Sequence, residues 1–431
     1  MIVHYLTIAS RNMWKYKSQT LISIVGLAVG FTCFALATLW IRYEMTFDSF
    51  HKNAEQIYVV YRQSPFSPSG YEKNSHYPLA AYLKETFPEV EDAMPVTPAY
   101  SKGTVVVENV TYPALTITAD SSIFRMFDIK IVEGSRDFLI PGSKNIAITR
   151  EKARQLFGNE NPIGKTIPMW DGEFAISAIV SDMSKRSNYA FDIIRPFREA
   201  PEHPWSVSYG ENIIIKLASN INIEEFEKKL YEHEFGAERN QYKNLKIKPI
   251  TKLRYTDPNI TREVNFFHIL IFAVSGILVI LCSLFNYLTL FVSRFRIRQK
   301  ELALRMVCGA SGRSLLTMLS VEFMLTLLIA VVFGSILTQL VHKPFLVLSE
   351  IQMNLSAIYS EMLGYIGSVI LVSLLAFWLI LFIFRRKNLN LSIRRINKNL
   401  SRKISVIVQL IISYCCPVNI KTLSNPYSEC R

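Results

Sequence analysis

The segment 157–167, FGNENPIGKTI, holds the residue types of a phosphate-binding loop: two glycines, followed by Lys165 and Thr166. Such a loop cradles phosphate with its backbone N–H groups, and it requires four residues between the first glycine and the Gly-Lys-Thr sequence. Here five residues separate Gly158 from Gly164, and a helix-like stretch precedes the loop where a strand is required. We therefore predict a structural turn that closes a helix, and no nucleotide site.

No other spacing of reactive residues points to catalysis. The sequence contains no HExxH or GxSxG motif, its seven histidines are scattered, and its six cysteines include no CxxC pair. We expect no catalytic residue, no metal site and no cofactor, and we do not expect the chain to be an enzyme.

Glu322 is the one carboxylate in the apolar stretch 315–341. An acid within a membrane span is a functional candidate by default. Glu322 lies only about two helical turns from the end of the stretch, so it can extend toward the interface or pair with an arginine of the adjacent basic segment. We favour a structural or packing role over ion relay.

That basic segment, 294–313, lies between two apolar stretches. Its composition predicts a helix at the cytoplasmic membrane surface, because short basic loops stay inside and apolar residues alternate with the charges. We expect Gly309 to end this helix. A single acid, Glu301, opposes six basic residues: Arg294, Arg296, Arg298, Lys300, Arg305 and Arg313.

The chain has 431 residues and a net charge of +13, with a mean hydropathy of +0.21. The positive charge concentrates in three blocks beside apolar stretches, at 11–17, 294–313 and 385–403. Basic residues placed in this way report membrane topology and contact with lipids. We expect membrane lipids as partners and no nucleic acid.

Four apolar stretches have the length of membrane spans, for which about 20 residues suffice. They cover 21–41, 266–292, 315–341 and 362–384. Residues 1–20 carry three basic residues and no acid, which predicts an amphipathic helix at the inner membrane surface.

Gly26 and Gly30 form a GxxxG spacing in the first span. This spacing lets two membrane helices approach closely. We expect Gly26, Gly30 and Glu322 to serve helix packing, although glycine is also common in membrane helices.

The positive charges define one orientation. The amino terminus, the segment 293–314 and the basic tail 385–431 lie in the cytoplasm, and the loop 342–361 and the polar block 42–265 lie outside. The interpretation is a multi-pass membrane protein with its amino terminus in the cytoplasm and its large domain outside the cytoplasm.

The polar block contains strand-like and helix-like segments without a regular βαβ alternation, which predicts an α+β domain. The predicted fold class is an α-helical membrane protein with four transmembrane helices and a large α+β extracytoplasmic domain between the first and second. We predict helices at 78–87, 150–158 and 223–235. We predict strands at 57–62, 104–110, 111–119, 145–149, 174–180 and 212–218.

RQKELALRMVCGASGRSLLTMLSVEFMLTLLIAVVFG (298–334) resembles the signature of the FtsX/MacB-type ABC transporter permeases. SQTLISIVGLAVGF (18–31) is similar to the first span of that family. ADSSIFRMFDIKIVEGS (119–135) and NIAITREKARQLFGNENPIGKTI (145–167) resemble the MacB-type periplasmic core domain. EMTFDSFHKNAEQIYVVYR (44–62) looks like the version common in Bacteroidetes.

The resemblance implies a permease subunit that couples ATP hydrolysis by a separate cytosolic ABC ATPase to movement of the periplasmic domain, by mechanotransmission, for efflux or envelope export. It implies a homodimer or pseudo-dimer, with a periplasmic adaptor or an outer-membrane protein as a further partner. An FtsX-like regulator of an envelope hydrolase, without transport, is the alternative. The residues expected to couple to the ATPase are Arg298, Lys300, Glu301, Arg305, Gly309 and Arg313.

Permeases of the Bacteroidetes type are often about twice as long as this chain, with a second membrane-plus-outer-domain half. RINKNLSRKISVIVQLIISY (395–414) resembles the opening of that second half. One hypothesis is a truncated first half of a longer permease, and the other is a natural four-span protein with a short surface helix.

Overall fold

The structure is a computed structural model of the chain. It describes residues 2–67, 69–99, 103–169, 171–198, 205, 210–236, 242–256 and 266–348, together with 364, 367, 370, 371, 374, 375 and 378. The chain divides into two compact units. We call Met1–Arg42 with Phe267–Arg431 the helical unit, and Tyr43–Phe266 the α+β unit.

Three helices of the described chain are long and apolar enough to cross a membrane, over Lys17–Met45, Phe266–Phe295 and Ser314–Leu346. They correspond to the first three predicted spans. The fourth, 362–384, lies largely outside the described residues, and its seven described positions are helical. The hypothesis about 395–414 falls outside them entirely. The helices are α1 (Ile2–Lys15), α2 (Lys17–Met45), α8 (Phe266–Ile297), α9 (Gln299–Val307) and α10 (Gly312–Leu348).

The long helices pack through an apolar core with small residues at the closest contacts. A Cβ added at Gly30 of α2 would lie 2.7 Å from Cβ of Ser283 on α8, whereas one at Gly26 would lie 3.7 Å from Nδ2 of Asn286. Gly30 is therefore the position of close approach, and Gly26 makes an ordinary contact. The core includes Leu27, Phe31, Ile280, Tyr287, Phe323 and Leu327.

The α+β unit is built on one large sheet, whose described strands follow the order β10-β11-β9-β12-β7-β4-β13-β1-β14, with β2, β3 and β8 paired at its sides. Most pairings are antiparallel, but β9–β11 and β7–β12 are parallel. The strands are β1 (Ile57–Gln63), β2 (Tyr71–Glu72), β3 (Asn74–Ser75), β4 (Val90–Thr97), β7 (Thr116–Ala119), β8 (Ile131–Gly134), β9 (Asn145–Thr149), β10 (Thr166–Met169), β11 (Gly172–Val180), β12 (Ile193–Arg195), β13 (Glu211–Leu217) and β14 (Lys246–Pro249).

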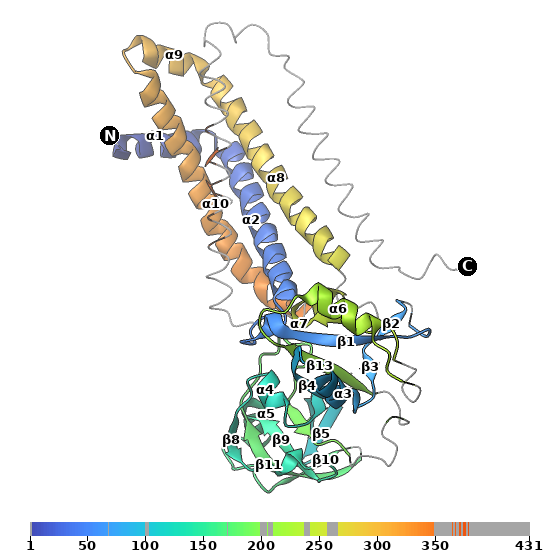
Figure 1. The fold of residues 1–431 in the computed structure, drawn as a ribbon. Helices are drawn as coiled ribbons and strands as arrows, with labels where there is room; N and C mark the ends of the chain where they lie inside the picture. The colour runs from blue at the N-terminus through green and yellow to red at the C-terminus, as the bar shows by residue number, and fades with distance from the viewer. Residues whose placement is uncertain are drawn as a thin grey trace, which may run out of the picture. The chain divides into compact units, whose positions relative to one another are not determined.

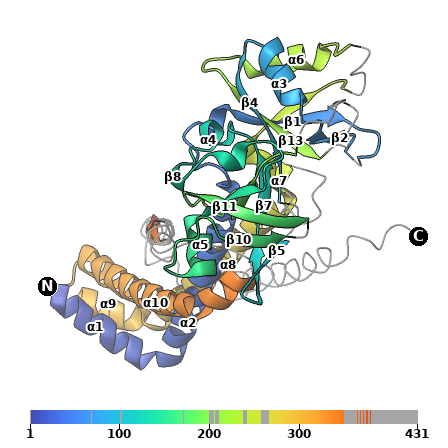
Figure 2. The ribbon, with the colours of Figure 1, turned by 90° about the horizontal axis from the view of Figure 1, so that it is seen from below.

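Helices cover both faces of this sheet (Figures 1 and 2). Alternate residues of a strand point to opposite faces, so Val59 of β1 joins the core beneath α4 and α7, while Tyr58 and Val60 join the core beneath α3 and α6. A third core lies beneath α5. The helices are α3 (Leu79–Thr86), α4 (Ile123–Met126), α5 (Arg150–Phe157), α6 (Ile223–Glu232) and α7 (Ile250–Thr256), with the short 3₁₀ helices η1 (Ala54–Gln56) and η2 (Asp137–Leu139).

The predicted helices at 78–87, 150–158 and 223–235 are confirmed as α3, α5 and α6, although α6 ends earlier, at Glu232. Four of the predicted strands are confirmed as β1, β9, β11 and β13.

The predicted division of 104–119 into two strands at 110/111 was wrong. The chain turns at Glu108 and Asn109, whose φ angles of 50° and 65° are both positive, as a two-residue hairpin turn requires. The turn separates β5 (Gly103–Val107) from β6 (Val110–Ala114), and β7 then joins the main sheet.

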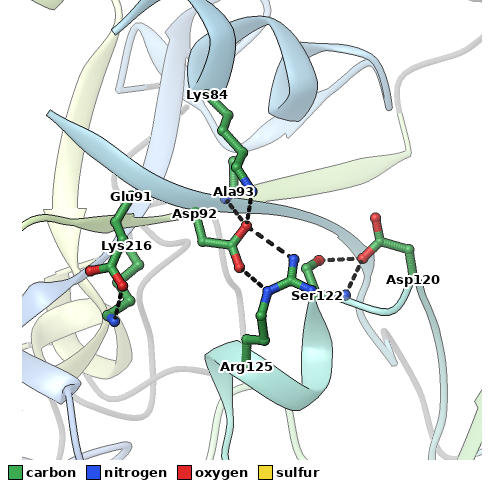
Figure 3. Close-up of polar contacts among 8 residues, drawn as sticks. All are labelled: Lys84, Glu91, Asp92, Ala93, Asp120, Ser122, Arg125 and Lys216. Carbon is green, nitrogen blue, oxygen red and sulfur yellow. Dashed lines mark hydrogen bonds and ion pairs between the residues drawn. The ribbon is translucent and has the colours of Figure 1, made fainter. Parts of the chain in front are cut away.

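A polar cluster joins three elements of the α+β unit (Figure 3). Asp92 of β4 accepts hydrogen bonds from Arg125 of α4, at 2.6 Å from Nε and 3.2 Å from Nη2, and from Nζ of Lys84 of α3, at 2.8 Å. Burial acts to raise the pKa of Asp92, but the hydrogen bonds from Arg125 and Lys84 outweigh it and hold the pKa below its usual value. The cluster fixes α3 and α4 to the same strand.

Candidate functional site

The basic segment forms a short helix between α8 and α10. Arg298 follows the end of α8 and precedes α9 with non-helical backbone angles. Gly309 has a φ of +94° after the end of α9, a conformation that glycine adopts without steric cost. Its N–H bonds to the carbonyl of Met306 at 3.0 Å, and the N–H of Ala310 bonds to that of Arg305 at 2.9 Å. The prediction that the helix ends at Gly309 is confirmed.

Of the two alternatives for Glu322, the structure shows the pairing with an arginine of the basic segment. Nη1 of Arg298 donates to Oε2 of Glu322 at 2.8 Å, and both side chains are only 3% exposed. Nδ2 of Asn12, from α1, donates to the same oxygen at 3.2 Å. One buried carboxylate therefore connects α1, the α8–α9 junction and α10.

The remaining acid of the segment is also paired within the chain. Nη2 of Arg305 donates to Oε1 of Glu301 at 3.0 Å, and Nε of Arg298 lies 3.7 Å from Oε2 of Glu301. Nη1 of Arg305 lies 3.4 Å from the sulfur of Met318 on α10. Arg298 and Arg305 thus each contact both Glu301 and a side chain of α10.

A second buried arginine lies one turn earlier, on α8. Nη1 of Arg294 donates to Oγ1 of Thr20 at 3.3 Å. Nε and Nη2 of Arg294, and the same two atoms of Arg298, have no hydrogen-bond partner among the described residues. The two guanidinium groups therefore retain buried donors, which is costly for a polar group removed from water.

The opposite face of α9 is exposed. The side chains of Leu304 and Val307 are 69% and 86% exposed. Lys300 and Cys308 are also exposed. Of the remaining predicted coupling residues, Arg313 lies in the first turn of α10, and its side chain is outside the description.

The end of the α8–α10 hairpin extends beyond the level of α1 (Figure 1). Glu322, which meets Asn12, lies ten residues after Gly312, where α10 begins. At 1.5 Å per residue this distance is roughly 15 Å. Glu322 therefore lies at the level of Asn12, and the start of α10 lies about three helical turns from it, while α9 reaches back along α10 to Met318 through Arg305.

Sequence reasoning missed Asn12 and Thr20 as members of this site. Asn12 lies at helical spacing from Tyr5, Ile8 and Ala9, and this spacing was the available sequence evidence. In the structure these four residues form the less exposed face of α1. Nothing in the sequence indicated that Thr20 would meet Arg294.

The glycine-rich segment 157–167 is a turn, as predicted. Gly158, with φ +62°, caps α5 and donates its N–H to the carbonyl of Arg154 at 2.9 Å. The N–H of Gly164 bonds to the carbonyl of Ile176 at 2.8 Å, and Lys165 pairs with Glu160. Among the described residues, no group of three His, Cys, Asp or Glu side chains could hold a metal ion.

Comparison with known families assigns both units. The MacB-like periplasmic core domain matches residues 20–232, and the FtsX-like permease C-terminal domain matches residues 273–392. A search of curated proteins found no significant match.

Several solved structures are similar to about half of the chain or slightly less. A domain of a permease protein from Porphyromonas gingivalis shares 18% identity at a TM-score of 0.39, covering 51% of this chain and 98% of that one. The periplasmic region of MacB from Actinobacillus actinomycetemcomitans shares 20% identity at 0.36, covering 48% and 95%. The extracellular domain of the noncanonic ABC-type transporter YknZ from Gram-positive bacteria shares 14% identity at 0.34, covering 44% and 99%.

A core domain of the MacB kind joined to an FtsX-like permease domain defines a membrane subunit of an ABC transporter. The chain belongs to the MacB/FtsX-type ABC transporter permeases. Permeases of this kind work with a cytosolic ABC ATPase, and they are transporter components rather than classical enzymes. The apolar helices and the MacB-like domain fit an inner-membrane protein with a periplasmic domain.

Proposed function

We propose that this permease couples ATP hydrolysis by a separate cytosolic ATPase to movement of its α+β unit, for efflux or export from the cell envelope. The observation that carries the proposal is the construction of α9. Its inner face is held to α10 by a buried ion pair, and its outer face exposes apolar side chains.

The exposed face of α9 suits docking to a protein partner. Leu304 and Val307 lie at the end of the hairpin, beyond the level of α1, where an aqueous environment disfavours large exposed apolar side chains. Lys300 is exposed on the same helix and adds a charge that a partner can recognise.

The inner face of α9 suits the transmission of force. Leu302 is buried, and the contacts of Arg298 and Arg305 run to α10. A displacement of α9 would therefore move the ends of α8 and α10 with it, since bending the segment would first break a buried ion pair.

We infer that the residues of this segment have two different roles. The pairing of Arg298, Glu301 and Arg305 within the chain supports a role in positioning α9. We assign the docking contacts to Lys300, Leu304 and Val307.

A further ion pair lies inside the α+β unit, close to the end of α2. Nε of Arg254, on α7, donates to Oε2 of Glu44, near the end of α2, at 2.8 Å. The Arg254 guanidinium lies 4.4 Å from the ring centroid of Phe47. This ion pair holds α7 to the end of α2, so we expect a movement of α2 to act on the α+β unit at α7.

Copurification tests the docking surface. The variant with Leu304→Asp and Val307→Asp should lose the ATPase, while the membrane level of the permease stays unchanged. The matched control is Val132→Asp, an exposed valine on β8. Retention of the ATPase by the double variant at the wild-type level would contradict the proposal.

Movement of the α+β unit is tested with a spin label at Ser181. We also propose that the permease is a homodimer, so the measured distance is the one between the labels of its two copies. ATP together with the ATPase should shift the distance distribution. An unchanged distribution, with measurable ATP hydrolysis, would rule out this form of coupling.

A further inference from the structure

A groove of about 860 Å³ lies in the helical unit between α1, α2 and α10. Its floor is apolar and comes from two membrane-type helices, with Leu21 and Ile24 on α2 and Leu325 and Ile329 on α10. Its rim is amphipathic and comes from α1 and the start of α2, with Trp14 and Lys17 among the lining residues.

Helix α1 presents three faces. Tyr5, Ile8, Ala9 and Asn12 form the face that packs toward the protein, where Tyr5 meets Ser314 and Asn12 meets Glu322. At 100° per residue, Leu6, Met13 and Trp14 follow on the next face, which lines the groove. Arg11 and Lys15 lie on the third face, which is exposed.

This arrangement is that of a helix lying in a membrane interface. Trp14 is 84% exposed, and tryptophan prefers the level of the lipid headgroups. An apolar face directed toward the acyl chains and a basic face directed toward water are the features of interfacial helices.

The charge around the rim has one sign. Lys17 lines the groove, Arg11 and Lys15 lie on the third face of α1, and the chain contains no acidic residue before Glu44. Each lysine or arginine near an anionic membrane surface contributes about 1 kcal/mol of attraction. A negatively charged headgroup therefore complements the rim, and an acyl chain complements the floor.

We propose that this groove binds an anionic phospholipid from the leaflet that α1 borders. Its headgroup lies against Lys17 and the hydroxyls of Ser10 and Ser18, and an acyl chain lies along Leu21, Ile24, Leu325 and Ile329. The proposal uses the membrane placement of the helical unit and is independent of ATPase coupling, so each can fail without the other.

The test uses the full chain in nanodiscs whose main lipid is unlabelled phosphatidylcholine. A minor lipid with brominated acyl chains is added, and it is either phosphatidylglycerol or phosphatidylcholine. Bromine quenches tryptophan on contact, and the difference between wild type and Trp14→Phe isolates the signal of Trp14. Brominated phosphatidylglycerol should quench Trp14 more strongly than brominated phosphatidylcholine at equal content. Equal quenching by the two lipids would overturn the proposal.

Two variants localise the preference. Lys17→Gln, at an exposed position, should weaken the preference for phosphatidylglycerol about fivefold. Ile329→Phe, which fills the floor, should reduce quenching by both lipids.

The charge-matched control is Lys300→Gln, which lies on α9 and outside the groove. It should keep the wild-type preference. A loss as large as that of Lys17→Gln would show diffuse charge attraction and contradict a bound lipid. A second copy of the chain could fill the groove instead of a lipid. In that case neither brominated lipid would quench Trp14, and the variant Leu21→Cys would cross-link two copies, which would contradict the proposal.

Discussion

The two units of the chain each contain a carboxylate held by a basic side chain, but they surround it differently. In the helical unit, Glu322 and Arg298 are both almost fully buried. In the α+β unit, Asp92 is also buried, but the side chains of Arg125 and Lys84 are 57% and 45% exposed (Figure 3). Solvent screens the second cluster and does not reach the first.

This difference separates two uses of the same chemistry. Asp92 has three strong donors, and its partners keep contact with water, so the cluster fastens helices to a strand at small net cost. The Glu322 site leaves buried donors of Arg294 and Arg298 without hydrogen bonds among the described residues. A buried pair with unused donors is weak evidence for stability, and we interpret it as fixing the position of α9.

The largest expected effect is that of Glu322→Ala. It leaves the Arg298 guanidinium buried without its carboxylate, and removing one partner of a buried pair costs about 3–5 kcal/mol. The measurement is the midpoint of SDS-induced loss of helical circular dichroism. A loss of stability below about 1 kcal/mol is typical of an exposed ion pair, and it would contradict the expectation for a buried pair.

The control removes all three polar groups at once. The variant Asn12→Leu with Arg298→Met and Glu322→Leu should be close to wild type in stability, because apolar replacement of a buried ion pair is often neutral. If it were as unstable as Glu322→Ala, packing rather than charge would explain the single variant.

The next effect compares two glycines of one helix. Gly30→Ala should destabilise the helical unit by about 1–3 kcal/mol, because its Cβ would overlap Ser283. Gly26→Ala, with room for its Cβ, should be neutral or slightly stabilising, since alanine favours helix. Ser283→Gly should rescue Gly30→Ala. Equal effects of the two alanines in the same SDS titration would contradict the close approach at Gly30.

A smaller effect is expected for Asp92→Asn, about 1 kcal/mol, because Arg125 and Lys84 are half exposed. The folded pKa of Asp92 is lowered, so its stabilisation is present above the unfolded pKa of about 3.9 and disappears as the pH falls through the folded value. Hydrogen exchange of α3 and α4 amides should differ between wild type and variant at pH 7 and converge in acid. A difference that grows in acid would contradict the assignment.

The smallest effect is expected in the turn 157–167. Lys165 pairs with Glu160 at the surface, and exposed pairs contribute little. Lys165→Gln should therefore leave the melting temperature unchanged, and neither protein should bind ATP in equilibrium dialysis. ATP binding that Lys165→Gln abolishes would contradict the interpretation as a turn.

The sequence predicted those parts of the fold that depend on local pattern. Long apolar stretches and β-branched segments such as NIAIT (145–149) indicate their helices and strands by composition and spacing within one segment. It missed β4, whose sequence VEDAMPVT contains two acids and a proline. These residues form a strand because β13 and β7 pair with it on either side, and one segment alone does not show that.

The same limit applies to the candidate site. The basic segment and Glu322 were visible as charges beside apolar stretches, and their pairing could be predicted because they lie within one hairpin. Asn12 could not be placed with them, because its contact depends on how α1 crosses α10. Which face of α9 is exposed also depends on tertiary packing.

The contact between Asn12 and Glu322 also sets an order of events during synthesis. The two residues are 310 positions apart, which at about 5–20 residues per second corresponds to roughly 15–60 s of translation. During that time α10 has not been synthesised, so the buried face of α1 lacks its partner. The contact between α1 and α10 therefore forms late, after the α8–α10 hairpin has been synthesised.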